Sequence, residues 1–219
     1  MKTSAKLVAL IIVSVFIFCG AAMAADRGDF STKPVTNEGK KWRIGYYEGG
    51  EYYDYKGVFV ATLKGMMNLG WIEHAEIPVD KGEQTDTIWK WLATHAKSDY
   101  VEFVADAHYS AKWDAKLRKQ MVEGIIKRLN EQKDIDLMIA IGTWAGKDLA
   151  NNRHHTPTVV LTASDAVGAG IIKSTEDSGY DHVQAHVDPS RYERQIRIFH
   201  DIVGFKTLGV AYELSLIHI

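Results

Sequence analysis

Residues 135–144 of the 219-residue chain read Ile-Asp-Leu-Met-Ile-Ala-Ile-Gly-Thr-Trp, a near-continuous apolar run that ends at a glycine. A run without alternating polar residues is typical of a strand covered on both faces of a parallel sheet. Gly142, Thr143 and Trp144 then stand where the strand passes into the next element. We therefore predict a buried strand over 135–141, followed directly by a short helix.

The segments on either side of this strand alternate between helix and strand patterns. Apolar residues recur at steps of three and four in 55–69, 85–95 and 112–129, which predicts three helices. Short apolar runs predict four further strands, at 42–47, 75–79, 100–105 and 158–162. Strands that alternate with helices predict a parallel, doubly wound α/β sheet, which we place in a first lobe over 42–187 with its crossover.

After this lobe the pattern begins again. Asp188-Pro189 is a typical helix start, with a capping side chain followed by proline at the first helical position. The predicted helix continues to about Val203, and 207–212 predicts a new strand. We interpret 188–213 as the start of a second α/β lobe. Residues 214–219, when back-translated, resemble a transposase end sequence used in sequencing libraries, so we expect them to be a non-native, adapter-derived tail.

Residues 1–24 have the features of a cleavable signal peptide. Two lysines precede an apolar run over 7–18, and the small residues of 22–24 form a cleavage site. The run is about a dozen residues long, whereas a membrane-spanning helix needs roughly 20. Lipidation of Cys19 is the alternative, but bulky residues precede this cysteine where small ones are usual. We expect an exported protein whose mature chain begins with a flexible leader over 25–41.

The composition argues against several function classes. Cys19 is the only cysteine, so the mature chain has neither an internal disulfide nor a catalytic thiol. A formal net charge of −2, with both signs mixed, lacks the basic stripe of nucleic-acid-binding proteins. The sequence motifs of serine hydrolases, phosphate-binding loops and dinucleotide-binding sheets are missing. We expect no enzymatic activity, no cofactor and no nucleic-acid partner.

Nine histidines raise the question of a metal site. His182, Gln184 and His186 would share one face of a strand, and His154 and His155 form a second group. Zinc needs about four converging ligands, and the chain has none of the usual paired-ligand motifs. We therefore expect no bound metal.

Candidate ligand-binding residues follow the predicted strands at their carboxyl ends, the edge where open α/β sheets bind ligands. Thr143 can hold a carboxylate together with the first N–H groups of its helix, or it only caps that helix. Trp144 can stack on a flat ligand or only pack against the core. Ser164 and Asp165 can accept a ligand ammonium or only cap the next helix.

The strand ends carry Asp106 to His108 as well, but the set that we predict to bind a ligand is narrower. It consists of Tyr47, Glu48, Gly142, Thr143, Trp144, Ser164 and Asp165.

Three segments of the chain resemble one protein family. They are Arg43 to Tyr46 at the first strand, Thr158 to Gly170 around the fifth, and Lys206 to Tyr212 near the end. On these segments residues 42–213 resemble the periplasmic substrate-binding proteins of ABC importers, of the two-lobed type I class. Within that class they are similar to the group often linked to aromatic amino-acid uptake.

The resemblance implies a non-catalytic periplasmic receptor that closes two lobes around a small solute, such as an amino acid or a related metabolite. The receptor would deliver this solute to an ABC permease in the inner membrane. The resemblance also implies that the sequence is truncated at its C-terminus, since most of a second lobe is missing. The alternative is the extracytoplasmic ligand-binding domain of a sensor, which has the same fold and normally continues into a membrane helix.

Overall fold

The computed structural model describes residues 31–79, 82 and 84–209. The signal peptide over 1–24, the first part of the leader and the tail over 214–219 lie outside these residues. The elements below all belong to one of two compact units of the chain, the unit that begins at Lys33.

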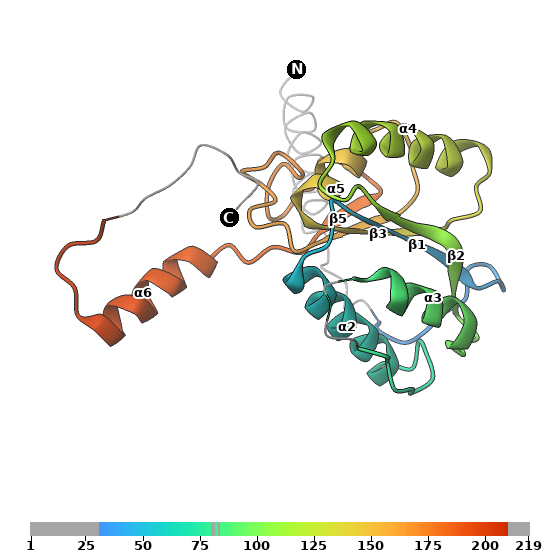
Figure 1. Cartoon of the computed structure of the whole chain (residues 1–219), viewed down its shortest axis with the longest axis horizontal. Helices are drawn as coiled ribbons and strands as arrows, with labels where there is room; N and C mark the ends of the chain where they lie inside the picture. The colour runs from blue at the N-terminus through green and yellow to red at the C-terminus, as the bar shows by residue number, and fades with distance from the viewer. Residues whose placement is uncertain (1–30, 80–81, 83, 210–219) are drawn as a thin grey trace, which may run out of the picture. The chain divides into compact units, whose positions relative to one another are not determined.

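One parallel sheet of five strands forms the centre of this unit, in the order β2-β1-β3-β4-β5 (Figure 1). The strands are β1 Trp42–Glu48, β2 Val101–Ser110, β3 Leu137–Ile141, β4 Thr158–Leu161 and β5 Val183–Ala185. The chain builds outward from β1 first to one side and then to the other, which is the doubly wound order. The predicted fold class is therefore confirmed.

Helices cover both faces of the sheet (Figure 1). They are α2 Tyr53–Asn68, α3 Asp86–His95, α4 Ala115–Glu131 and α5 Gly142–Leu149. Because side chains alternate along a strand, neighbouring residues of β1 enter different cores. Tyr46 packs with α2 and α3 in one apolar cluster, and Tyr47 packs with α4 and α5 in the other.

The prediction of a strand over 75–79 is wrong. These residues have no regular secondary structure, and only Ile77 among them is buried. Pro78 has no N–H to give to a strand ladder, which disfavours a place within a sheet. The fifth strand lies instead at Val183–Ala185, in the segment assigned to the crossover, where it pairs with β4.

Two boundaries around β2 also differ from the prediction. The strand continues to Ser110, so Asp106 to His108 lies inside it and not at its end. The next helix begins only at Ala115, because the side chain of Asp114 accepts hydrogen bonds from the N–H groups of Lys116 and Leu117 and so caps the helix.

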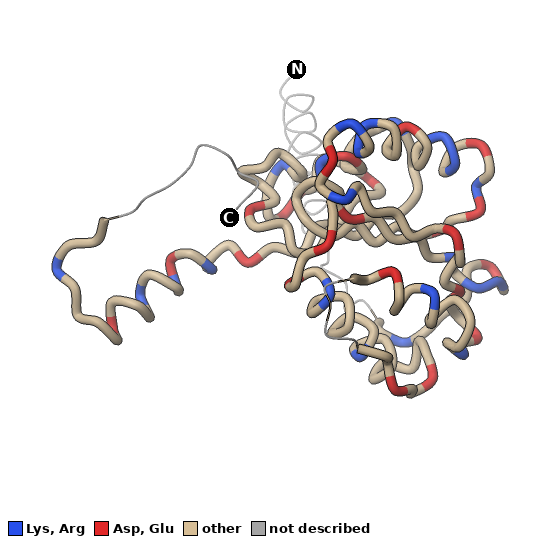
Figure 2. Tube along the Cα trace, in the orientation of Figure 1, with Lys and Arg blue, Asp and Glu red and all other residues tan. Residues whose placement is uncertain are grey.

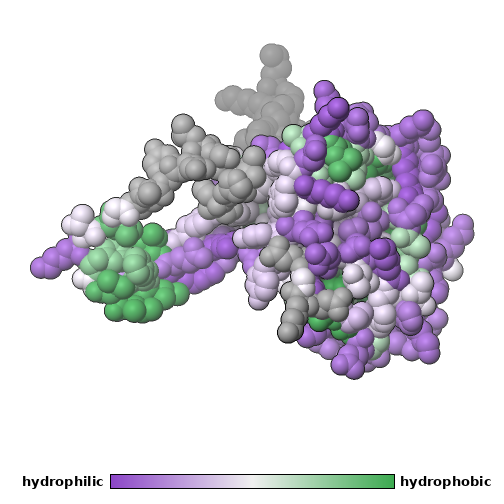
Figure 3. Space-filling model, viewed as in Figure 1, coloured by the Kyte–Doolittle hydropathy of each residue, from purple (hydrophilic) through white to green (hydrophobic). Residues whose placement is uncertain are grey.

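Helix α6 (Arg191–Val203) follows the sheet and ends at Gly204, which has a φ of +66°. It begins three residues after the predicted start at Asp188, and none of its residues is buried. Figure 3 shows apolar side chains gathered along this helix. Of the strand predicted over 207–212, the described residues 207–209 form no strand, and the others lie outside the described part.

Charges of both signs are interspersed along the chain, α4 included (Figure 2). None of the helices in the described ranges has the length and apolar character that crossing a membrane requires.

Candidate functional site

The carboxyl ends of four strands meet along one side of the sheet. Glu48 at the end of β1 pairs with Ser110 of β2 and with Ile141 of β3, and Ile141 pairs with Leu161 of β4. The residues that follow these ends form what we call the carboxyl edge, made up of 48–50, 110–114, 142–144 and 162–165. The fold thus brings the predicted ligand-binding segments into neighbouring loops.

The backbone turns sharply along the carboxyl edge. Gly142 has a φ of +85°, and a Cβ atom at this position would lie 2.0 Å from the hydroxyl oxygen of Tyr55. Three residues other than glycine also have positive φ there, namely Thr162 at 55°, Lys112 at 51° and Trp113 at 58°. Such conformations are uncommon for side chains with a Cβ and often occur at functional sites.

Trp113 covers the loop that follows β1. A Cβ on Gly50 would lie 2.6 Å from the Trp113 ring, so the indole needs a glycine beneath it. The Trp113 backbone N–H donates to the carbonyl of Gly49 at 2.9 Å, and its indole N–H donates to the carbonyl of Glu51 at 2.9 Å. Trp113 as a whole nevertheless remains 42% exposed, so this residue presents apolar surface at the carboxyl edge.

Trp144, at the third position of α5, extends this aromatic surface. Its ring meets that of Trp113 edge to face at 5.5 Å, and the ring of Tyr55 lies 6.1 Å from Trp113. The guanidinium carbon of Arg118 lies 4.4 Å from the centroid of the Trp144 ring. The Trp144 indole nitrogen is buried and has no hydrogen-bond partner among the described residues.

Tyr47 and Glu48 lie beneath this surface. Tyr47 has no exposed area, and its hydroxyl donates to Asp148 Oδ2 at 2.7 Å. Burial raises the pKa of Tyr47, which keeps the hydroxyl protonated as a donor. Glu48 is 1% exposed and accepts hydrogen bonds from the hydroxyls of Tyr46 and Thr85. A solute at the edge would meet neither side chain directly in this conformation.

Gly142 and Thr143 form the first turn of α5, and no side chain caps the start of this helix. The first backbone N–H groups of a helix have no partner within it and carry partial positive charge. Thr143 is half-buried at the second helical position. Its hydroxyl and the neighbouring N–H groups can therefore bind an anionic group.

Ser164 and Asp165 follow β4 in a turn and not in a helix. Asp165 is exposed, and its Oδ1 accepts a hydrogen bond from the N–H of Gly168 at 2.8 Å. Its backbone carbonyl accepts from the N–H of Ala169 at 2.9 Å. The Asp165 side chain thus stabilises the local turn through Oδ1. Binding of a ligand ammonium by Asp165 stays a prediction.

Three of the histidines, His154, His155 and His182, gather at the opposite, amino-terminal side of the sheet. The ring of His154 meets that of His182 at 5.0 Å, and His155 meets His182 at 5.6 Å. His182 immediately precedes β5, and its carbonyl accepts from the N–H of Thr158 at the start of β4. Within the described ranges, no group of three or more His, Cys, Asp or Glu side chains is arranged to hold a metal ion.

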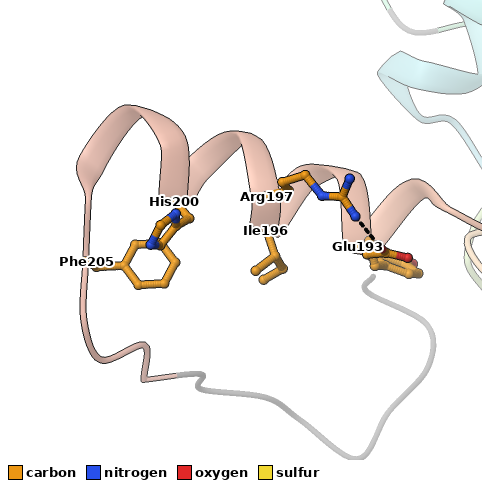
Figure 4. Close-up of a pocket in the computed structure, with 6 residues that line it drawn as sticks. Glu193, Ile196, Arg197, His200 and Phe205 are labelled. Carbon is orange, nitrogen blue, oxygen red and sulfur yellow. Dashed lines mark hydrogen bonds and ion pairs between the residues drawn. The ribbon is translucent and has the colours of Figure 1, made fainter.

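The two surface hollows of note lie elsewhere. Figure 4 shows the larger one beside α6, where Ile196, His200 and Phe205 line it and Arg197 pairs with Glu193. The other lies between α4 and α5 and includes the side chains of Arg118 and Asp148. None of the seven predicted ligand-binding residues lines either hollow.

A family model described as "ABC transporter substrate binding protein" matches residues 102–215. The chain belongs to this family. The match covers β2 to α6 and therefore three of the four loops of the carboxyl edge. The family is defined by binding a substrate and not by converting it, which agrees with the expected non-enzymatic class.

Solved structures with a similar fold include other substrate-binding proteins. An ABC domain in complex with L-Trp from Streptococcus pneumonia is 16% identical, with a TM-score of 0.46 over 67% of this chain and 38% of its own. A conserved domain protein from Vibrio cholerae O1 is 16% identical, with a TM-score of 0.47 over 75% and 45%. A ligand-free, open substrate-binding protein with adhesive properties from Clostridium difficile is 18% identical, with a TM-score of 0.46 over 72% and 43%.

In each case the matched region is less than half the length of the solved structure. No curated protein matches the chain significantly.

Trp113 of the carboxyl edge, and Tyr55 and Arg118 beside it, were not predicted from the sequence. Trp113 was included in the helix predicted over 112–129, so it was not considered for a loop. One residue could have indicated the correct helix start. Asp114 is a favourable N-cap, and a helix capped by Asp114 leaves Trp113 in the preceding loop. Tyr55 and Arg118 reach the edge from helices, which only the three-dimensional packing reveals.

Proposed function

We propose that this family member is the solute receptor of an ABC importer and acts in the periplasm. The family match supports the transport role, and the signal-peptide pattern of residues 1–24 supports export. The receptor would present its solute to an ABC permease in the inner membrane.

The solute binds, in this proposal, at the carboxyl edge, between the described lobe and a second lobe. The observation that carries this placement is the pair formed by Trp113 and Trp144 beside the uncapped start of α5. Enclosure between two lobes would bury most of the solute, as efficient ligand sites require. The solute would bind best to the closed arrangement and so favour closure.

The chemistry of the edge favours a small solute with an apolar part and an anionic part. The Trp113 ring offers exposed apolar area, and the N-terminus of α5 with Thr143 offers donors and positive potential. Asp165, whose side chain is exposed, is our candidate for an ammonium group. Amino acids and related metabolites combine these groups, and we propose them as the solute class.

The test is a thermal-shift screen of the full-length protein against the common amino acids and other small metabolites. A specific solute stabilises the native state by mass action, so at least one compound should raise the melting temperature in a concentration-dependent way. Trp113→Ala should abolish that increase, whereas the control Trp91→Ala on α3 should keep it. Stabilisation that is unchanged by Trp113→Ala would contradict the proposed site.

A further inference from the structure

Trp144 lacks the contact that usually fixes a buried indole. Buried polar groups are nearly always hydrogen-bonded, yet the Trp144 indole N–H has no acceptor in the described part of the chain. The orientation of the ring therefore depends on what packs against it. Trp144 packs against the apolar cluster beneath α4 and α5, its ring meets Trp113 edge to face, and the guanidinium of Arg118 lies over the ring face.

Arg118 is itself held rigidly. Its Nε donates to Asp148 Oδ2 and its Nη2 donates to Asp148 Oδ1, both at 2.8 Å, which is the bidentate geometry of a strong pair. The side chains are only 23% and 14% exposed, so solvent screens the pair less than it would at the surface. Asp148 Oδ2 also accepts a hydrogen bond from the Tyr47 hydroxyl at 2.7 Å.

These contacts connect three elements around one ring. Tyr47 comes from β1, Arg118 from α4, and Asp148 from α5, one helical turn after Trp144. A planar guanidinium can pair with a carboxylate through its edge while it stacks on an indole through its face. The ion pair holds the guanidinium over the Trp144 ring, where it can restrain the ring in turn.

We infer that Arg118 is a positioning residue for solute binding, which holds the Trp144 ring in its binding orientation and is anchored for this purpose by Asp148 and Tyr47. The inference rests on the proposed function, since it assumes that Trp144 contacts the solute. It gives Tyr47, a buried member of the predicted binding set, an indirect role.

Arg118→Lys tests the inference, because lysine keeps the charge but cannot pair in bidentate fashion and stack at the same time. The chain offers a matched control in Arg153→Lys. Arg153 makes a bidentate pair with Glu123 of α4 at 2.9 and 2.5 Å and does not contact Trp144. Asp148→Asn, which removes the charge that anchors Arg118, provides a second variant if Arg118→Lys folds poorly.

The first readout needs no solute. The full-length protein, labelled with 15N at its tryptophan indoles, should give a Trp144 N–H signal that can be assigned by its loss in Trp144→Phe. Arg118→Lys and Asp148→Asn should shift or broaden this signal, while Arg153→Lys leaves it unchanged. A Trp144 signal that is the same in wild type and in both test variants would overturn the inference.

The second readout is calorimetric titration with L-phenylalanine, a probe that combines a ring with carboxylate and ammonium groups. Arg118→Lys should weaken its binding about three- to tenfold, a change of the size of one cation–π contact, because the Trp144 ring is no longer held in its binding orientation, whereas Arg153→Lys should leave the affinity unchanged. A purely structural role predicts a lower melting temperature with unchanged affinity, and that result would also overturn the inference. If wild type binds neither this probe nor any screened solute while the Trp144 signal still shifts, the proposed function fails and the positioning of the ring stands.

Discussion

The hydroxyl of Thr85 donates a hydrogen bond to Glu48 Oε2 across 2.9 Å, which joins the start of α3 to the end of β1. Both residues are only 1% exposed, and Tyr46 donates to the same carboxylate oxygen at 2.7 Å. The carboxyl edge therefore rests on a buried polar network that also includes His108, whose Nε2 lies 2.8 Å from the Thr85 hydroxyl.

Two substitutions of Glu48 should distinguish the effect of its hydrogen bonds on stability from the effect of its charge. Glu48→Gln keeps an oxygen that accepts from both hydroxyls, whereas Glu48→Ala leaves two buried hydroxyls without their acceptor and should cost about 1–3 kcal/mol. Burial raises the pKa of the Glu48 carboxyl above 4.5, so the native protein holds its proton to a higher pH than the unfolded chain does. The stability that this protonated carboxyl contributes is complete below pH 4.5, and it is lost as the pH rises through the raised pKa. Glu48→Gln should remove this loss.

Urea unfolding of the three proteins across this pH range measures both effects. If Glu48→Gln destabilises the fold as much as Glu48→Ala does, the hydrogen-bond account of Glu48 is wrong.

Acid should destabilise the fold through the buried His154 and the partly buried His108. Burial lowers the pKa of His108 and of His154 from 6.5 to about 4. The unfolded chain therefore binds more protons than the native one between these values, and stability should fall as the pH drops from 6.5 toward 4. His154→Gln should reduce the slope of unfolding free energy against pH in this window relative to the wild type. A pKa for His154 at or above 6.5 by NMR titration would refute this expectation.

Gly142 should tolerate no side chain. Alanine at this position would combine a φ of +85° with a Cβ atom 2.0 Å from the Tyr55 hydroxyl oxygen, and we expect a loss of at least about 2 kcal/mol. The control is Gly124→Ala in the exposed middle of α4, where nothing lies within 4 Å and alanine should stabilise by about 0.5–1 kcal/mol. Equal unfolding free energies for the two variants would count against a required glycine at the start of α5.

Thr143 should contribute directly to solute affinity. Thr143→Ala in the full-length receptor should weaken binding by about 1–2 kcal/mol, as expected for the loss of one hydrogen bond to a charged group. Thr94→Ala on the exposed surface of α3 serves as the control. Calorimetry with a solute identified by the screen measures the difference, and unchanged affinity would remove Thr143 from the site.

The sequence predicted the elements that carry strong periodicity and less of what depends on packing. The run over 135–141 and the apolar stripe of 112–129 correspond to β3 and α4, because burial on two faces or on one face leaves a clear pattern. The segment over 75–79 has a similar apolar content, but Pro78 and the exposure of its neighbours keep it out of the sheet. The three-residue β5 is too short to show a period at all.

The candidate site likewise has features that the sequence predicts and features that depend on packing. Strand ends can be placed from sequence, and Glu48, Thr143 and Asp165 do lie at or after the ends of neighbouring strands, although their binding of a ligand stays a prediction. Whether a side chain at a strand end faces outward or into a core depends on the register, and the sequence did not reveal that Glu48 is buried. The contact between Arg118 and Trp144 joins two helices and has no local signature.

The six tryptophans of the chain can report where the solute binds, because two of them lie at the carboxyl edge and the others lie elsewhere. The indole N–H signals of the full-length protein can be followed by NMR during titration with an amino acid that raises the melting temperature. If the solute binds at the carboxyl edge, the signals of Trp113 and Trp144 should move until saturation, while those of Trp42 at the start of β1 and Trp71 after α2 stay in place. Movement confined to Trp42 and Trp71 would contradict it.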